Sequence, residues 1–218
     1  MAERTTIAVI ISGRGTNMAA IVRAAQSGAI AADVAVVIAD RAAAGLELAR
    51  LRGIATELVA ARDFTNRAAF DAALAEAIDR SGARLIALAG FMRILTAGFV
   101  DRYRGRLVNI HPSLLPLHKG LHTHRQVLAA HDPRHGASVH FVTPDLDGGP
   151  VIAQAALDVL PDDTESTLSV RVQRLEHMLY PRVCGWLASG RVTLDGDRVV
   201  FDGKRLDQPI METLDGRN

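Results

Sequence analysis

The sequence predicts an α/β fold: an open, mainly parallel, twisted sheet with helices on both faces and an antiparallel C-terminal portion. In the first half of the 218-residue chain, apolar runs of strand length alternate with segments whose apolar residues recur at helical spacing. In the second half, two longer strand-like runs and a terminal hairpin replace this alternation. Repeated strand–helix–strand units favour a parallel sheet that is covered on both faces.

Continuous apolar runs mark the strands, because a strand that is buried on both faces has no polar alternation. Parallel strands are predicted at residues 6–11, 34–38, 56–59, 85–88 and 107–110. Antiparallel pairing is predicted for residues 137–142 and 151–160, and a hairpin around an Asp-Gly turn for residues 191–201. The arrangement is Rossmann-like. Such sheets bind ligands at the carboxyl ends of their strands, where each motif described below is expected to lie.

Helices are predicted where apolar residues recur at intervals of three and four. The predicted helices cover residues 18–25, closed by Gly28, residues 43–52, stopped by Gly53, and residues 64–80 and 164–187. Asp162 or Asp163 is the expected N-cap of the last helix, and Pro181 is expected to kink it or to end its regular part. Because no repeat or linker interrupts the chain, residues 1–218 are predicted to form a single domain.

Composition excludes several classes of protein. Hydrophobic residues make up 49% of the chain and charged residues 22%, as in ordinary globular proteins. The net charge of +1 provides no basic excess for nucleic acid or an anionic membrane, so neither partner is expected. The single cysteine, Cys184, cannot form an internal disulfide and is expected to be a buried, inert thiol. No apolar run has the length of a signal peptide or a membrane span, so a cytoplasmic location is expected.

A glycine-rich turn, Ser-Gly-Arg-Gly-Thr-Asn at residues 12–17, separates the first strand from the first helix. Glycines allow the backbone to approach an anion closely, and the amides at the start of a helix can bind phosphate. No Gly-Lys-Ser/Thr follows, and Met18 stands where a dinucleotide fingerprint has its third glycine. The turn fits either a plain tight turn or a phosphate site, and a mononucleotide phosphate fits it better than a pyrophosphate.

Candidate catalytic groups lie in the middle of the chain, where all eight histidines fall between His111 and His177. Asn109 and His111 are two residues apart at a strand end, so their side chains project to the same side. An amide donor beside an imidazole suits a site that stabilises an oxyanion and moves a proton. Asp147 precedes two glycines that free the backbone to turn its carboxylate inward, where it would favour the cationic form of His111. Taken singly, each motif is also compatible with a simple turn.

A metal site is not expected, although His118, His122 and His124 lie close together in the sequence. No cysteine or carboxylate cluster completes a ligand set, and the spacing of His122 and His124 is not that of a helical metal pair. These residues and Lys119 are expected to lie in a solvated loop that has some contact with the ligand, and no firm role is assigned to them.

Six strings of the sequence, in this order, resemble the folate-dependent formyltransferases. They lie at residues 12–17, 88–95, 109–116, 120–124, 136–142 and 146–150 and span most of the chain. The string Asn-x-His-Pro-Ser-Leu-Leu-Pro at 109–116 and the Asp-Gly-Gly at 147–149 are shared by the wider family. The glycine-rich turn and Phe-Met-Arg-Ile-Leu at 91–95 point to the members whose acceptor is glycinamide ribonucleotide.

The resemblance implies transfer of the formyl group of 10-formyltetrahydrofolate, as co-substrate, to the amine of glycinamide ribonucleotide in purine synthesis. It implies small-molecule partners only, no metal, and a monomer or homodimer. The implied catalytic residues are Asn109, His111 and Asp147. The implied ribonucleotide-binding residues are Gly15, Thr16, Asn17, Arg67, Gln173 and Glu176, of which the last three could equally be exposed helix residues. The implied folate-binding residues are Met92, Arg93, Ile94, Leu95, Val142 and Asp147.

Four alternatives remain at this point. A methionyl-tRNA formyltransferase is expected to have an additional basic C-terminal domain. A formyltetrahydrofolate hydrolase is expected to have an additional N-terminal regulatory domain. The sequence is expected to have no room for either domain. A dinucleotide-binding oxidoreductase would need the third glycine and an acidic ribose ligand, for which Asp40 is the only candidate. A non-catalytic nucleotide- or folate-binding module is disfavoured because Asn109, His111 and Asp147 are all present.

Overall fold

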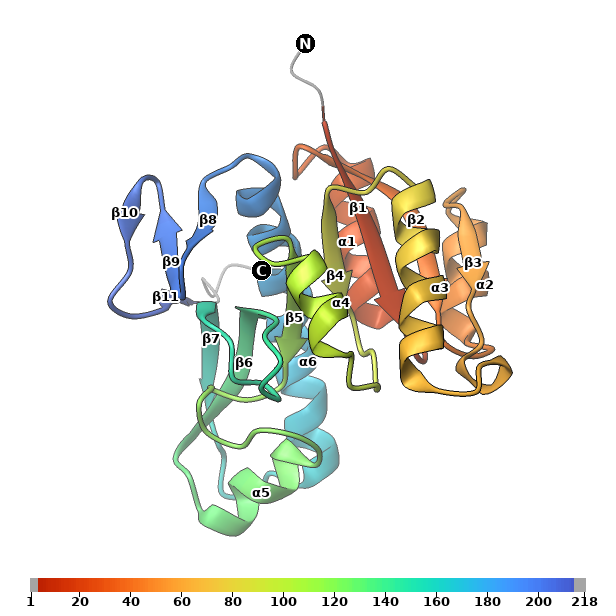
Figure 1. Ribbon diagram of the computed structural model, residues 1–218. Helices are drawn as coiled ribbons and strands as arrows, with labels where there is room; N and C mark the ends of the chain where they lie inside the picture. The colour runs from red at the N-terminus through yellow and green to blue at the C-terminus, as the bar shows by residue number, and fades with distance from the viewer. Residues whose placement is uncertain (1–3, 214–218) are drawn as a thin grey trace.

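The computed structural model describes residues 4–213 and contains an eight-stranded sheet, a three-stranded sheet and flanking helices (Figure 1). The large sheet consists of β1 (Thr5–Ile11), β2 (Ala32–Ala39), β3 (Thr56–Leu58), β4 (Leu85–Leu88), β5 (Leu107–His111), β6 (Arg134–Phe141), β7 (Val151–Asp158) and β11 (Ile210–Glu212). The small sheet consists of β8 (Val192–Asp195), β9 (Arg198–Phe201) and β10 (Lys204–Arg205). The helices are α1 (Thr16–Gln26), α2 (Ala44–Leu51), the 3-10 turn η1 (Ala61–Asp63), α3 (Arg67–Arg80), α4 (Ala97–Arg102), α5 (Thr123–Ala130) and α6 (Glu165–Ala188).

The strand order β11-β7-β6-β5-β4-β1-β2-β3 joins a parallel half to a mixed half. Strands β3, β2, β1, β4 and β5 are parallel, whereas β6 runs antiparallel to both β5 and β7. The predicted fold class is therefore confirmed, including its antiparallel portion. Within residues 4–213, no helix is long and apolar enough to cross a membrane.

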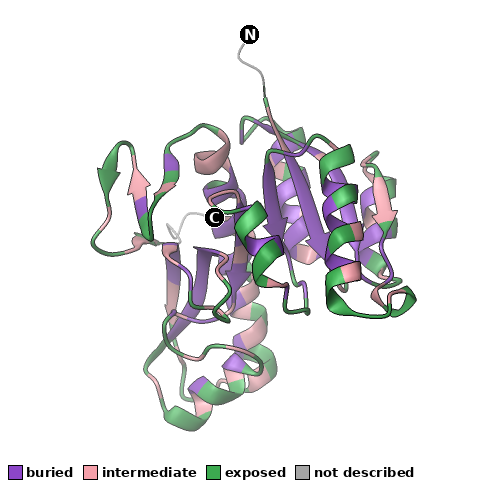
Figure 2. Ribbon diagram, in the orientation of Figure 1, coloured by how far each residue is buried: buried purple, intermediate pink, exposed green. Residues whose placement is uncertain are grey.

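Two apolar cores lie on the two faces of the large sheet, whose central strands are buried in Figure 2. Side chains alternate along β1, so that Ile7 and Val9 enter one core and Ala8 enters the other. Residues of α1, α2 and α6 pack on the first face, and residues of α3 and α4 pack on the second. Along β5, Val108 and Ile110 face the first core, which directs Asn109 to the opposite face.

Three local predictions are corrected by the hydrogen bonds at helix ends. Helix α3 begins at Arg67 rather than at residue 64, because the Asn66 side chain accepts a hydrogen bond from the Ala69 amide at 2.9 Å. Helix α6 is capped by Thr164, neither by Asp162 nor by Asp163, and Thr164 and Thr167 form a capping box. Pro181 does not end this helix, which continues to Ala188.

The segment after β6 follows the carboxyl end of its strand, as predicted, but that end lies at the opposite edge of the sheet from the carboxyl end of β5. Because β6 is antiparallel to β5, its last residue, Phe141, pairs with Val108 near the start of β5. The chain then folds back through residues 142–150 along the sheet. Gly149 permits this path, since a Cβ there would lie only 1.9 Å from the Phe141 carbonyl oxygen.

Tyr180 links α6 to the two strands that carry the candidate site. The ring is fully buried, and its hydroxyl lies 2.9 Å from the Leu88 carbonyl oxygen and 3.1 Å from the Val108 carbonyl oxygen. Leu88 ends β4, and Val108 precedes Asn109 in β5. One hydroxyl hydrogen is therefore shared between carbonyl acceptors of both strands.

We expect Tyr180→Phe to destabilise the protein by about 1–3 kcal/mol, because it leaves buried carbonyl groups without a donor. Urea unfolding measures the change. The exposed residue Val170 of the same helix provides the control: Val170→Ala should change stability by less than about 0.5 kcal/mol. Equal stability of Tyr180→Phe and the wild type would contradict this role of the hydroxyl.

Candidate active site

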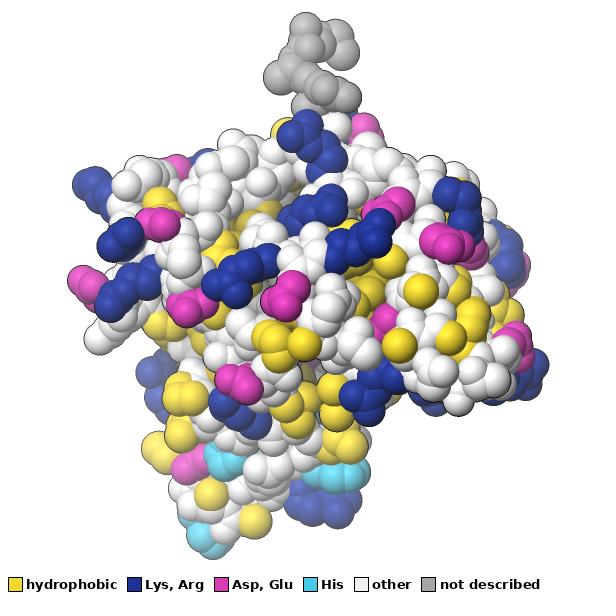
Figure 3. All heavy atoms as spheres, viewed as in Figure 1, with side chains coloured by type: hydrophobic (Ala, Val, Ile, Leu, Met, Phe, Trp, Pro, Cys, Tyr) yellow, Lys and Arg dark blue, Asp and Glu magenta, His cyan; other side chains and the backbone are white. Residues whose placement is uncertain are grey.

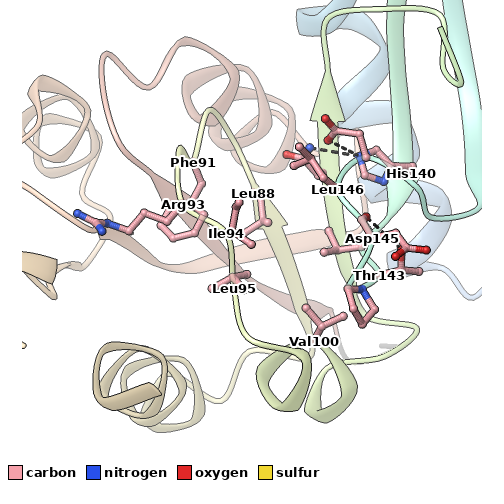
Figure 4. A pocket seen from close by; sticks show the side chains of 14 residues that line it. Leu88, Phe91, Arg93, Ile94, Leu95, Val100, His140, Thr143, Asp145 and Leu146 are labelled. Carbon is pink, nitrogen blue, oxygen red and sulfur yellow. Dashed lines mark hydrogen bonds and ion pairs between the residues drawn. The ribbon is translucent and has the colours of Figure 1, made fainter. Parts of the chain in front are cut away.

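The largest apolar cavity near the predicted residues has a volume of about 500 Å³ and lies beside the ends of β4 and β5. Its walls come from residues 90–94 after β4, residues 109–112, the 120–124 segment, Leu146, Asp147 and Glu165. A smaller cavity of about 100 Å³ adjoins it between residues 88–95 and residues 140–147 (Figure 4). Asn109 and Asp147 line both cavities and therefore stand where the two meet.

The three predicted catalytic side chains are brought together at this junction. His111 Nδ1 lies 3.5 Å from Asp147 Oδ2, and both side chains are largely buried. The same Asp147 oxygen accepts a hydrogen bond from the Gly120 amide at 2.9 Å. Asn109 is on the same strand face as His111, as their spacing predicts. The site thus combines an amide, an imidazole and a carboxylate within one water-poor pocket.

His111 has hydrogen-bond acceptors at both ring nitrogens. Nδ1 faces the Asp147 carboxylate, and Nε2 lies 2.9 Å from the backbone carbonyl oxygen of His118. An imidazole donates from both nitrogens only when it carries two protons. Both ring nitrogens of His111 thus face groups that can accept a hydrogen bond.

The glycine-rich turn meets helix α6, and four predicted ribonucleotide-binding residues lie together there. Gln173 Nε2 donates to Thr16 Oγ1 at 3.2 Å, and Asn17 Nδ2 donates to Glu176 Oε2 at 3.0 Å. Glu176 is buried, so the alternative of an exposed helix residue is wrong for it, and burial raises the pKa of its carboxyl above the usual value. Gly15 has a φ of +74°, a backbone conformation that suits glycine.

Arg67, by contrast, lies apart from these residues. It is exposed at the start of α3 and lines a separate hollow of about 470 Å³ with Phe64, Phe70 and residues 92–94. None of Gly15, Thr16, Asn17, Gln173 and Glu176 lines that hollow. The structure therefore groups Arg67 with the predicted folate segment rather than with the glycine-rich turn.

Five of the six predicted folate-binding residues line the small cavity: Arg93, Ile94, Leu95, Val142 and Asp147. Met92 is the exception; its side chain is exposed and lines the larger cavity instead. The walls of the small cavity also include the apolar side chains of Leu88, Phe91 and Val100 (Figure 4). An apolar slot that opens beside exposed backbone suits a flat heteroaromatic ring.

The guanidinium of Arg93 points away from the small cavity and pairs with Asp40 at the end of β2, with Nε 2.6 Å from Oδ2 (Figure 4). The Asp40 side chain is fully buried; burial raises its pKa, but hydrogen bonds from Arg41, Ser12 and Arg93 outweigh this and hold the pKa below its usual value. Asp40, the only candidate ribose ligand of a dinucleotide-binding enzyme, is thus already engaged by two arginines.

Sequence reasoning assigned no role to His140 or Ser12, although both fall within the six strings. His140 pairs directly with Asn109 across the β5–β6 ladder, and its Nε2 lies 3.2 Å from Asn109 Nδ2. Ser12 Oγ accepts a hydrogen bond from the Met92 amide at 3.0 Å and so joins the glycine-rich turn to the folate segment. Both contacts depend on which strands are neighbours, a property that no local pattern reveals.

Residues 5–184 match the formyl transferase family. The chain belongs to this family. It is 49% identical over 201 residues to the phosphoribosylglycinamide formyltransferase of Escherichia coli K12, covering 92% of this chain and 95% of that protein. It is 39% identical over 201 residues to the phosphoribosylglycinamide formyltransferase of Haemophilus influenzae, with 92% and 95% coverage.

Solved structures of formyl transferases have the same fold. The phosphoribosylglycinamide formyltransferase of Coxiella burnetii, in complex with CHES, superposes with a TM-score of 0.92 at 46% identity and covers 96% of this chain and 99% of that one. Glycinamide ribonucleotide transformylase 1 of Symbiobacterium toebii superposes with a TM-score of 0.89 at 42% identity, with 92% and 95% coverage. The resemblance predicted from the six strings is therefore confirmed.

In this formyl transferase, several histidines gather near α5, where Figure 3 shows histidine atoms at the surface. His118 Nε2 lies 2.5 Å from Asp132 Oδ2, and His124 Nδ1 lies 2.9 Å from His135 Nε2. Among residues 4–213, no group of three or more histidines, cysteines and carboxylates is arranged to hold a metal ion. Burial, followed by the nearby His124 and His118, lowers the pKa of His135 to about 4.

Stability should fall as the pH decreases from about 6.5 to about 4, because the unfolded chain binds a proton at His135 that the native state resists. The part of the free energy of unfolding that is lost at this residue is at most about 3 kcal/mol. In urea unfolding across this pH range, the free energy of unfolding of His135→Gln should decline less steeply with decreasing pH than that of the wild type. His131→Gln, which alters an exposed histidine, should retain the wild-type decline. An unchanged slope for His135→Gln would contradict the assignment.

Proposed function

We propose that this formyl transferase moves the formyl group of 10-formyltetrahydrofolate to the amine of glycinamide ribonucleotide. The products are N-formylglycinamide ribonucleotide and tetrahydrofolate, in purine synthesis. The observation that carries this proposal is the convergence of Asn109, His111 and Asp147 where the large apolar cavity meets the small one. The names of the Escherichia coli and Haemophilus influenzae relatives support it. We further propose that the chain works as one domain in the cytosol, on small molecules, as a monomer or homodimer.

The two substrates would occupy opposite sides of the catalytic residues. The pterin ring of the folate would enter the small apolar cavity, where the backbone of residues 142–147 offers hydrogen-bonding groups. The phosphate of the ribonucleotide would lie at the start of α1, where Gly15 brings the chain close and the first amides of the helix point outward. Thr16, Asn17, Gln173 and Glu176 would contact the ribonucleotide from around this turn.

Asn109 and protonated His111 would stabilise the reaction's transition state. As the substrate amine attacks the formyl carbon, the formyl oxygen becomes negative, and both residues would donate hydrogen bonds to it. The oxygen would replace the His118 carbonyl as the acceptor at His111 Nε2. Removing one donor of this kind typically costs about a hundredfold to a thousandfold in rate.

Asp147 would act through charge and proton transfer. Its carboxylate faces His111 Nδ1 and would keep the imidazole cationic. It would also help to carry the proton that the attacking amine loses, directly or through a water molecule, to the folate nitrogen, which leaves as its bond to the formyl carbon breaks. Holding both substrates in one cavity would supply much of the remaining acceleration. No step in this scheme requires a metal ion.

The purified protein, mixed with 10-formyltetrahydrofolate and glycinamide ribonucleotide, should form tetrahydrofolate only when both substrates are present, as absorbance measures. Asp147→Asn should fold normally and lose at least about a hundredfold in turnover, because the carboxylate charge and its proton transfer are lost. Asp162→Asn, at an exposed aspartate, should keep wild-type turnover. Tetrahydrofolate formed without ribonucleotide would indicate a hydrolase, and near-normal turnover of Asp147→Asn would refute the catalytic assignment.

We also propose that Arg67 binds the glutamate tail of the folate rather than the ribonucleotide phosphate. Its hollow shares Met92, Arg93 and Ile94 with the larger cavity, and folates end in carboxylates. Arg67→Met should raise KM for a polyglutamylated folate about two- to fivefold, which corresponds to the free energy of an exposed ion pair. KM for the ribonucleotide should stay unchanged. Arg62→Met, which removes another exposed arginine nearby, should change neither KM. A raised KM for the ribonucleotide alone would restore the phosphate assignment.

A further inference from the structure

His140 is buried beside the catalytic amide and takes no part in the scheme above. It lies on β6, directly opposite Asn109 on β5, and is only 2% exposed. Its Nδ1 lies 2.9 Å from the carbonyl oxygen of Phe141, and its Nε2 lies 3.2 Å from Asn109 Nδ2. Asp147 Oδ1 lies 3.7 Å from the same Nε2. The ring is therefore held between a backbone acceptor, the catalytic amide and the catalytic carboxylate.

The Phe141 carbonyl determines which nitrogen of His140 carries the proton. A carbonyl oxygen can only accept a hydrogen bond, so Nδ1 must be the donor. A neutral imidazole has one N–H, which leaves an unprotonated Nε2 that accepts. Burial lowers the pKa of His140 and favours this neutral form; the Phe141 carbonyl and Asp147 raise that pKa, and His111 and Lys119 lower it further.

An unprotonated Nε2 determines the orientation of the Asn109 side chain. A carboxamide can present either its NH2 group or its oxygen to a neighbour, but a bare ring nitrogen accepts only from N–H. The Asn109 nitrogen must therefore face His140 with one of its two hydrogens. The second N–H of the same group remains available to the cavities that Asn109 lines.

The neutral state of His140 also preserves the charge of Asp147. A protonated His140 would present an N–H at Nε2, repel the NH2 group of Asn109 and attract the Asp147 carboxylate. The amide would then turn its oxygen toward His140, and Asp147 would be shared between two cations. Neutral His140 leaves Asp147 to His111, whose Nδ1 lies 3.5 Å from the other carboxylate oxygen.

We propose that His140 is a positioning residue: as a neutral imidazole with its proton on Nδ1, it orients the Asn109 amide so that one N–H points at the formyl oxygen. This role deepens the proposed formyl transfer and rests on it for its kinetic consequences. The tautomer and the Asn109 contact themselves are properties of the free protein and do not depend on the reaction.

Two substitutions separate the two hydrogen bonds of the ring. His140→Asn can still donate to the Phe141 carbonyl but offers no acceptor to Asn109, whereas His140→Gln can place an amide oxygen near the former Nε2. We expect His140→Asn to lower kcat by about ten- to a hundredfold with KM changed less than about threefold, since one donor is misplaced while the binding surfaces remain. His140→Gln should retain at least about ten times the kcat of His140→Asn. His131→Asn, at an exposed histidine, should retain wild-type kcat.

A double-mutant cycle with Asn109 distinguishes positioning from a general structural effect. If His140 acts through Asn109, His140→Asn should lower kcat by less than about twofold further when Asn109 is already alanine. A loss in that background as large as in the wild type would overturn the proposal. Equal kcat for His140→Asn and His140→Gln would also overturn it.

Nitrogen-15 NMR of the imidazole groups tests the tautomer without any substrate. At neutral pH, His140 should show a protonated Nδ1 and an unprotonated Nε2 that couples to an Asn109 amide proton. A protonated Nε2 would overturn the proposal whatever the kinetics. If the wild-type protein transferred no formyl group, the proposed function would fail, and the NMR result alone would uphold or overturn the orientation of Asn109 by His140.

Discussion

The antiparallel pairing of β5 with β6 determines how Asn109, His140 and Asp147 come together. It sets His140 opposite Asn109, and it makes the chain leave β6 near the start of β5. Residues 142–150 then run back along the sheet and place Asp147 beside His111. A parallel β6 would deliver the following segment to the same edge as Asn109 and would place a different residue beside the amide.

The parallel half of the sheet contributes the contacts that join the glycine-rich turn to the segment after β4. The ends of β1, β2 and β4 meet where Ser12 joins the Met92 amide and Asp40 pairs with Arg93. A related architecture uses an acidic residue at the end of its second strand to bind a ribose. Here that carboxylate pairs with Arg41 and with Arg93, which lines the small cavity, so one structural position has different partners in related sheets.

Most of the fold could be predicted from the sequence, because the hydrophobic patterns coincide with the strands and helices of the structure. Strand-length runs located seven of the eight strands of the large sheet, and the spacing of Asn109 and His111 predicted their shared face correctly. Elements with too few residues to show a period, such as α4 and β11, were not predicted. The role of His140, the backward path to Asp147 and the distance of Arg67 from the glycine-rich turn depend on strand neighbours and loop direction, which local patterns do not encode.

Asp147 has a φ of +47°, a left-handed backbone conformation that few residues other than glycine adopt. Aspartate and asparagine are the usual exceptions, because their short polar side chains can bond locally. Glutamate carries the same charge but lacks this tolerance. The position is therefore restricted twice, by the carboxylate that faces His111 and by the left-handed backbone that carries it. Aspartate satisfies both conditions, whereas asparagine tolerates the backbone conformation but lacks the charge.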